Sequence, residues 1–243
     1  MKNIFVLLFA FLFIGITGNA QFGHVSRYEL TGGIGATHIF GDIGGFSRGE
    51  NLIGLKDLSF KQTSLNISAG VRYRILENVS ARVSLAAGSF RSTDERGSNE
   101  NRGFESNSLF LEPTLTGEYY ILRNNRNHNL KSSNQNPDRS FFSLPDVYVF
   151  TGIGGISYKI NPNSALEPRV SATRGFTAVI PAGAGISMNY SDAIKFGIEL
   201  SGRYSFSDDI DGYTSVYSKS KDAYYFFNLT MGYRIGRAKA LFD

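Results

Sequence analysis

The chain has 243 residues, a formal net charge of +4, 27 glycines and 14% aromatic residues, but no cysteine and no tryptophan. The lack of cysteine excludes disulfides, zinc–thiolate sites and cysteine nucleophiles. Basic and acidic residues are mixed along the chain rather than gathered in blocks, so the small positive charge does not indicate a nucleic-acid partner.

Residues 1–20 have the pattern of a cleaved export signal peptide. Lys2 gives a positive start, an apolar run extends from Ile4 to Ile16, and Gly18 and Ala20 place small residues where a signal peptidase reads. A transmembrane anchor is the alternative, but the run is shorter than the ~20 residues that a membrane-spanning helix needs. No cysteine follows, which excludes a lipid-anchored lipoprotein. We expect one exported domain over residues 21–243.

Segments with alternating apolar and polar residues follow one another along this domain. In 65-LNISAGVRYRI-75, the odd positions are apolar and the even positions are polar or glycine. This period of two indicates β-strands, and the segments are longer than the five or six residues usual in globular sheets. We expect eight strands, at about 27–42, 63–76, 79–90, 107–122, 146–159, 177–190, 193–206 and 223–236.

The two faces of these strands distinguish a membrane barrel from a β-sandwich or a soluble ligand barrel. The polar face is mostly Gly, Ser, Thr and Asn, which suits a narrow lumen better than a solvent-facing surface. From Tyr28 to Phe40 a strand spans about 40 Å, or about 28 Å when tilted, close to the ~25 Å apolar band of an outer-membrane barrel. By parity we expect aromatic girdles on the apolar face, with Tyr28, Tyr73, Tyr119, Tyr148, Tyr190 and Tyr233 at one end and Phe40, Tyr158, Phe206 and Tyr225 at the other.

The predicted fold is therefore an all-β, eight-stranded antiparallel outer-membrane β-barrel with both termini in the periplasm, surrounded by outer-membrane lipid. Its lumen is predicted to hold ionic side chains, namely Arg72, Arg74, Arg82, Lys195, Arg203, Arg234, Glu29, Glu112, Glu118 and Glu199. Buried charges must be paired, so we expect a network that locks the barrel. A proton or ion path through the lumen is the alternative.

Nothing in the sequence indicates catalysis, a cofactor or a metal site. Small membrane barrels that act as enzymes need a nucleophile, a base and an orienting acid near the outer rim. His24 precedes the barrel, His128 lies in a periplasmic connection, and His38 is near the rim but on the lipid-facing side by parity. We therefore expect no catalytic, cofactor-binding or metal-binding residues.

The stretch 207-SDDIDGYTSVYSKSKDAYYF-226 contains Asp208, Asp209 and Asp211, which could form a calcium loop or a pair of catalytic carboxylates. It lacks the closing Glu of an EF-hand loop. A catalytic pair would need a buried cleft to separate the two pKa values. We interpret the stretch as the tip of the last extracellular loop, with its carboxylates in water.

The connection over 123–146 is long although it falls on the periplasmic side, where turns are short. It is rich in Asn and carries Arg123, Arg126, Lys131 and Arg139. It is either a disordered insertion or a docking site for a periplasmic partner.

Several motifs resemble one known family. The stretches are 28-YELTGGIGATHIFGDIGG-45, 148-YVFTGIGGISYK-159, 179-VIPAGAGISMNYSDAIKFGIELSGRYSFSDDIDGY-213 and 222-DAYYFFNLTMGYRI-235. They are similar to the outer-membrane barrel family that includes PorG of the type IX secretion system. The resemblance implies a non-enzymatic barrel that anchors or couples a periplasmic ring or lipoprotein partner, with loop 123–146 and the chain ends as the contact surface. A free-standing barrel for envelope stability or adhesion is the second hypothesis, and a lipid-modifying enzyme is the third.

Overall fold

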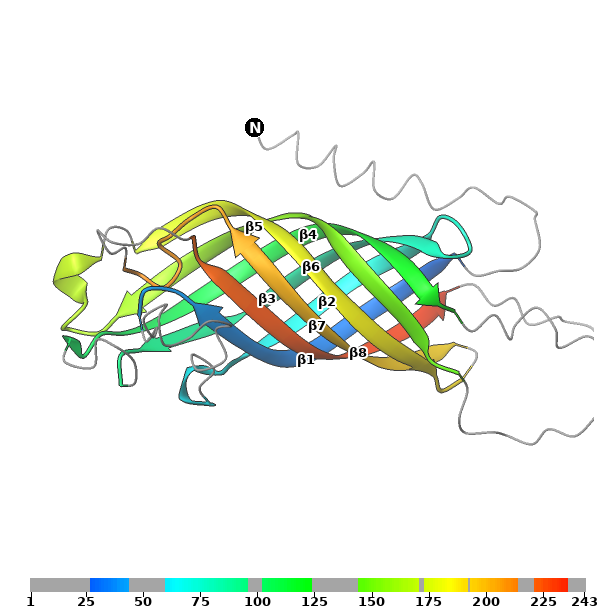
Figure 1. The fold of residues 1–243 in the computed structure, drawn as a ribbon, viewed down its shortest axis with the longest axis horizontal. Helices are drawn as coiled ribbons and strands as arrows, with labels where there is room; N and C mark the ends of the chain where they lie inside the picture. Colours follow the sequence, from blue (N-terminus) through cyan, green and yellow to red (C-terminus); the bar gives the residue numbers. More distant parts are fainter. Residues whose placement is uncertain are drawn as a thin grey trace, which may run out of the picture. The chain divides into compact units, whose positions relative to one another are not determined.

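The structure is a computed structural model that describes residues 27–43, 60–95, 102–123, 144–170, 173–191, 193–213 and 221–235. Its strands form a closed barrel in the order β1-β2-β3-β4-β5-β6-β7-β8, and β8 pairs with β1 (Figure 1). Every neighbouring pair is antiparallel. The predicted eight-stranded antiparallel fold is confirmed. The described residues include no helix long and apolar enough to cross a membrane.

The strands differ in length around the barrel. The shorter ones, of 11 to 13 residues, are β1 (Tyr28–Phe40), β2 (Ser64–Arg74), β7 (Ile194–Ser205) and β8 (Ala223–Ile235). The longer ones, of 15 to 18 residues, are β3 (Val79–Thr93), β4 (Glu105–Leu122), β5 (Asp146–Pro162) and β6 (Arg174–Asn189). Among the residues that the structure describes, two short 3-10 helices, η3 (Phe60–Gln62) and η6 (Glu167–Arg169), lie between strands.

The barrel has two different ends. At the terminal end, β1 begins and β8 ends, and tight turns join β2 to β3 and β6 to β7, with backbone bonds of 3.0 Å from Ile75 to Val79 and from Tyr190 to Ile194. At the loop end lie the connections after β1, β3, β5 and β7. Here β5 continues to Pro162, past the expected 159, and β6 begins at Arg174, before the expected 177. The alternation of apolar residues ends before the hydrogen-bonded pairing of β5 with its neighbours does, because backbone hydrogen bonds do not require apolar side chains.

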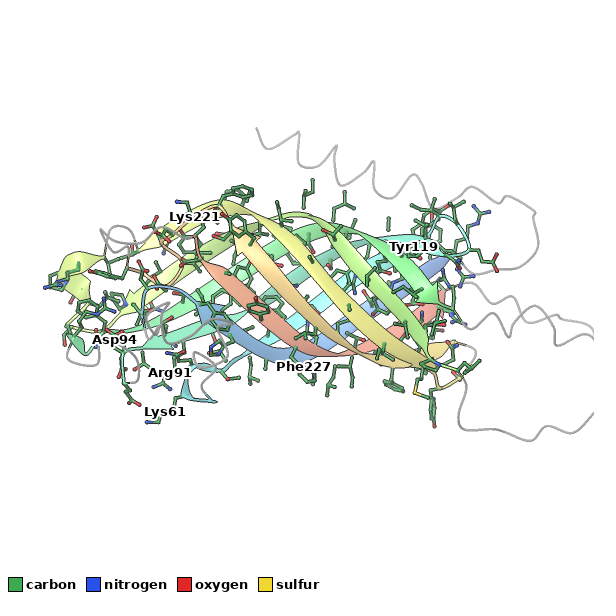
Figure 2. All side chains as sticks on the ribbon, in the orientation of Figure 1. Lys61, Arg91, Asp94, Tyr119, Lys221 and Phe227 are labelled. Carbon is green, nitrogen blue, oxygen red and sulfur yellow. The ribbon has the colours of Figure 1, made fainter. Side chains whose placement is uncertain are left out.

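The barrel has apolar side chains on its outside and charged side chains in its interior, the reverse of the distribution in a soluble protein. On the outside, Leu65 is 75% exposed and Ile153 is 67% exposed, while Glu112 and Glu118 inside are each 1% exposed. Soluble proteins rarely expose such continuous apolar surface, and charged side chains are almost never fully buried unless paired. Figure 2 shows the outward side chain of Phe227 midway along the barrel and Tyr119 near the terminal end. The exterior is therefore built to contact lipid.

The expected aromatic girdles hold for most of their members. Large exposed rings at the terminal end belong to Tyr28, Tyr119, Tyr190 and Tyr233, and at the loop end to Phe206 and Tyr225. The prediction was wrong for Tyr148 and Tyr158, which are buried inside the barrel. On β5 apolar side chains occupy both faces, with Val149 and Ile153 outside and Phe150 and Ile156 inside. Alternation alone therefore did not identify the lumenal face of this strand.

Candidate functional site

The terminal half of the lumen contains a balanced ionic network. Glu118 accepts from Arg72 at 2.6 and 3.1 Å and lies 2.9 Å from Arg82, whose guanidinium is also 2.6 Å from Glu199. The network joins four basic and four acidic side chains, Arg72, Arg82, Lys195 and Arg234 with Glu29, Glu118, Glu199 and Asp146. Opposite charges therefore balance within the part of the lumen that the structure describes.

The predicted lumenal set is confirmed with one exception. Arg74 is half-buried at the terminal end of β2 and belongs to none of the ion pairs found among the described residues. One carboxylate of the network, Asp146, was missed from sequence, as were two tyrosines that donate hydrogen bonds to the network, Tyr120 and Tyr148. Tyr148 donates to Glu199 at 2.5 Å and Tyr120 donates to Glu118 at 3.3 Å. The even-numbered positions of β4 and β5 would have indicated all three, once the lumenal face of β5 was known.

A second ion pair lies nearer the loop end. Arg203 donates to Glu112 at 3.1 Å, Tyr224 donates to the same carboxylate at 2.5 Å, and the guanidinium of Arg203 lies 3.8 Å from the centroid of the Phe226 ring. A cavity of about 40 Å³ reaches from Arg82 and Glu199 to Arg203 and Glu112. That volume holds a few water molecules at ~10–15 Å³ each and no larger ligand.

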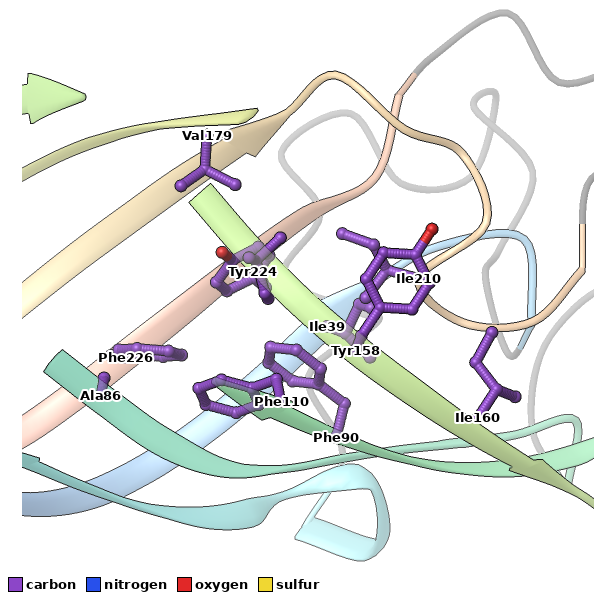
Figure 3. Packing of buried hydrophobic residues seen from close by; sticks show 11 residues of the cluster. Ile39, Ala86, Phe90, Phe110, Tyr158, Ile160, Val179, Ile210, Tyr224 and Phe226 are labelled. Atoms are coloured by element: carbon purple, nitrogen blue, oxygen red, sulfur yellow. The ribbon is translucent and has the colours of Figure 1, made fainter. Parts of the chain in front are cut away.

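Beyond this pair, the lumen is filled by a lumenal aromatic cluster (Figure 3). The Phe90 and Phe110 rings are stacked with centroids 4.5 Å apart, and the Phe110 and Phe226 centroids are 5.5 Å apart. The cluster consists of Ile39, Ala86, Phe90, Phe110, Ile156, Tyr158, Ile160, Val179, Ile210, Tyr224 and Phe226. Eight-stranded barrels are filled by their own side chains, and this one is closed by apolar rings as well as by ion pairs.

The connection after β7 folds back over this cluster as a loop-end cap, defined here as residues 207–213 together with Asp222. Ile210 is fully buried in the aromatic cluster, and its carbonyl accepts from Ser108 at 2.9 Å. The carboxylate of Asp211 accepts from the backbone N–H groups of Ile43 and Tyr213, each at 3.0 Å. Asp222 accepts from the N–H of Ile210 at 2.8 Å.

The expectation that the carboxylates of this stretch face water was therefore wrong for Asp211, which is 0% exposed. Because the apolar side chain of Ile210 packs in the aromatic cluster, the adjacent Asp211 is buried with it. Burial raises the pKa of Asp211 to about 7, and burial together with the charge of Asp211 raises the pKa of Asp222 to about 9. Asp208 and Asp209 stay half-buried.

The remaining candidates are not brought together into a reactive arrangement. His38 has the outward parity of β1, but its side chain is only 6% exposed, with its ring centroid 4.8 Å from that of Phe40, so the expectation that it faces lipid was wrong. His24 and His128 lie outside the described residues, as do the export signal and most of loop 123–146. No group of three or more metal-ligating side chains occurs within the described ranges.

Comparisons with known proteins identify a family. The family model described as Domain of unknown function (DUF6089) matches residues 4–240. No curated protein matches the sequence significantly. The barrel is similar to Neisserial surface protein A (NspA), at 10% identity and a TM-score of 0.44, over 88% of this chain and 99% of that chain. It is also similar to Ail, the attachment invasion locus protein of Yersinia pestis, at 15% identity and a TM-score of 0.42, over 86% and 99%. OprG from Pseudomonas aeruginosa is similar at 10% identity and a TM-score of 0.41, over 87% and 97%.

Proposed function

The chain belongs to the DUF6089 family, and we propose that it is a non-enzymatic, closed barrel of the bacterial outer membrane that anchors a protein-secretion apparatus. The observation that carries this proposal is the filled lumen. Ion pairs block the terminal half, and the aromatic cluster and the loop-end cap block the other half. A barrel closed in this way conducts no solute, and its rigid wall suits a structural role.

The membrane placement follows from the wall itself. In a bilayer every backbone polar group must be satisfied within the protein, and a closed barrel does so because it has no unpaired edge. The pairing of β8 with β1 closes the sheet, and the outward side chains are apolar. An export signal at 1–20 and termini in the periplasm complete the proposal, with the loop end facing the outside.

The secretion role rests on the resemblance to the family that includes PorG. Two of the motifs that carry the resemblance meet in space, because the exit of β1 at Gly41–Ile43 contacts Asp211 of the cap. The first-strand motif and the motif that contains Asp211 therefore lie together in space, where both take part in the contacts of the loop-end cap. Loop 123–146, with Arg123, Arg126, Lys131 and Arg139, remains the proposed docking site for a periplasmic ring or lipoprotein partner.

Cross-linking in intact cells followed by detergent extraction tests the role. We expect the barrel to recover periplasmic or lipoprotein components of a secretion apparatus, and deletion of its gene to reduce export of the proteins that use it. Replacing 126–140 by a Gly–Ser linker of equal length should abolish recovery, whereas the same replacement of 214–220 at the loop end should leave it unchanged. Normal export without the gene would contradict the proposal, and unchanged recovery without 126–140 would remove the loop from it.

Two other functions remain as alternatives. A free-standing barrel that supports envelope stability or adhesion is favoured by further contacts at the loop end. There Arg102 bonds Asp94 at 3.0 and 3.1 Å, and its guanidinium lies over the rings of Phe104 and Tyr213. Normal export combined with a weakened envelope in the deletion strain would support this alternative. A lipid-modifying enzyme, the least favoured, would be supported by a changed lipid A mass profile.

A further inference from the structure

The outer wall at the loop end is chemically asymmetric. Around β7, β8 and β1, the apolar band ends in rings, those of Tyr204, Phe206, Tyr225 and Phe40. On β3, β5 and β6 it ends instead in basic side chains, Arg91, Lys159 and Arg174, all exposed. These strands are also among the longer ones, so the wall on this side extends past the apolar band.

The three basic residues form one outward-facing row, named here the cationic row. Lys159 is directly opposite Arg174 in the β5–β6 register. On β4, Leu109 is opposite Lys159, and Asn107, two positions away, is opposite Arg91 of β3. Neighbouring strands lie about 4.8 Å apart, so the row crosses four strands and spans about 15 Å. That width is comparable to a lipid headgroup that carries more than one phosphate.

No member of the cationic row has a hydrogen bond or ion pair with any residue that the structure describes. Glu95 feels the charge of Arg91, but its hydrogen-bonded partner is Lys61, at 2.5 Å, and Asp94 pairs with Arg102. Glu105 is opposite Thr93, further toward the loops than Asn107. Like charges directly opposite one another, as Lys159 and Arg174 are, destabilise a pair of strands. An anion from outside the protein would relieve this repulsion.

The surface next to the row indicates what kind of molecule supplies the anion. One step toward the middle of the wall, on either side of Ser157, lie the exposed apolar side chains of Leu111 and Phe176. A molecule that covers both surfaces has acyl chains along the strands and negative groups at the height of the row. Arginine binds phosphate oxygens with two parallel hydrogen bonds, and lysine binds them as a point charge.

We propose that Arg91, Lys159 and Arg174 bind the phosphate groups of a phosphorylated lipid in the outer leaflet, on the β3–β6 side of the barrel. This inference rests on the proposed outer-membrane placement with the loop end outside. The outward faces of β7, β8 and β1, as far as the structure describes these strands, carry no such row, so the lipid is held on one side of the barrel. The bound lipid would fix the orientation of the barrel relative to its neighbours in the membrane.

The test uses the full-length mature chain in nanodiscs of phosphatidylcholine, with insertion first measured by the heat-dependent gel shift of the barrel. Diphosphorylated lipid A or its enzymatically dephosphorylated form is then added, and the lipid retained is counted by native mass spectrometry. We expect selective retention of the diphosphorylated form. The Lys159→Gln/Arg174→Gln variant should retain it about tenfold less, as expected for the loss of charge-assisted bonds, and 0.5 M salt should weaken retention in the wild type.

The matched control is Lys221→Gln, which removes an exposed basic residue at the loop end outside the row. Figure 2 shows Lys221 and Arg91 near the loop end, at separate places on the barrel. Retention by this variant should equal that of the wild type. Equal retention of both lipids by the wild type, or equal loss in both variants, would overturn the lipid site while leaving the membrane barrel intact. Failure to insert into any nanodisc would instead contradict the proposed function.

Discussion

The backbone N–H of Ile43 donates a hydrogen bond of 3.0 Å to the carboxylate of Asp211, which lies 168 residues away in the sequence. This bond joins the exit of β1 to the connection between β7 and β8 at the loop end of the barrel. Asp211 is accommodated because residue 41 is glycine, since a Cβ there would lie 2.3 Å from its carboxylate oxygen. Gly212 next to it has a φ of 94°, which favours glycine.

Gly41→Ala should therefore loosen the cap. The added methyl group would collide with the buried carboxylate and displace it from the N–H of Ile43. We expect faster tryptic cleavage after Lys221 and a lower melting temperature. Gly117→Ala is the matched control, because the nearest atom to its new Cβ is 4.0 Å away. Equal behaviour of the two variants would show that the contact does not hold the cap.

The cap should also weaken as the pH rises. An aspartate in an unfolded chain has a pKa of ~3.9, whereas Asp211 and Asp222 in the cap have pKa values raised to about 7 and about 9. The folded cap binds protons more tightly, so its extra stability is complete below about pH 4 and is lost as the pH rises through 7 and 9. Asp42 and Asp208 add to the negative charge nearby.

Limited proteolysis at a series of pH values measures this effect. Cleavage after Lys221 should be faster at pH 9 than at pH 6, once corrected for the activity of trypsin on an unstructured peptide of the same sequence. Asp222→Asn should flatten the dependence, because the amide oxygen still accepts from Ile210 but does not ionise. A dependence as steep in this variant as in the wild type would argue against the buried carboxylates as its source.

Removal of one lumenal carboxylate should destabilise the whole barrel. Glu118→Gln leaves Arg72 and Arg82 with one carboxylate fewer in a lumen from which water is largely excluded. Loss of one partner from a buried pair costs about 3–5 kcal/mol, measured as the urea midpoint of refolding into vesicles. Glu95→Gln, which breaks the exposed Lys61–Glu95 pair, should change the midpoint little. Similar midpoints for both variants would mean that the network does not lock the barrel.

Two adjacent phenylalanines on β8 face opposite sides of the barrel wall, one toward the lumen and the other toward lipid. Phe226 is 0% exposed in the lumenal aromatic cluster, and Phe227 is 48% exposed on the outside. Phe226→Ala should cost about 3–5 kcal/mol, because it leaves a cavity that the rigid wall does not fill. Phe227→Ala should cost less, because acyl chains can occupy the vacated space. The refolding midpoint measures both, and a larger loss at position 227 would reverse the assignment of the two faces.

The alternation of residues was sufficient to predict the fold and most of the lumenal charges. On β2 and β7, one face is apolar apart from Gly202 and the other carries Gly, Ser, Asn and charged residues, so the lumenal parity of Arg72 and Glu199 was clear. Which lumenal charges pair with one another was harder to predict from the sequence, because the pairing depends on the register between strands. Glu118 and Arg72 meet across the interior from strands that are not neighbours.

The interior near the loops was not predictable by the same means. On β5, apolar residues face both lipid and lumen, so Tyr148 and Tyr158 were assigned to the wrong side. The burial of Asp211 depends on a contact between Gly41 and a loop far away in sequence, which no local pattern indicates. The inward parity of Phe90, Phe110 and Phe226 was a usable signal for the aromatic cluster, since apolar residues at lumenal positions imply a dry section of the interior.

Electrical conductance tests the central claim, that this is a membrane barrel with a closed lumen. Proteoliposomes with a measured content of folded barrel are fused with a planar bilayer, and the current is recorded at both polarities. We predict a current equal to that of protein-free membranes, because ion pairs, aromatic rings and the cap fill the lumen in succession. Reproducible ohmic steps whose number rises with the amount of fused barrel would contradict the account.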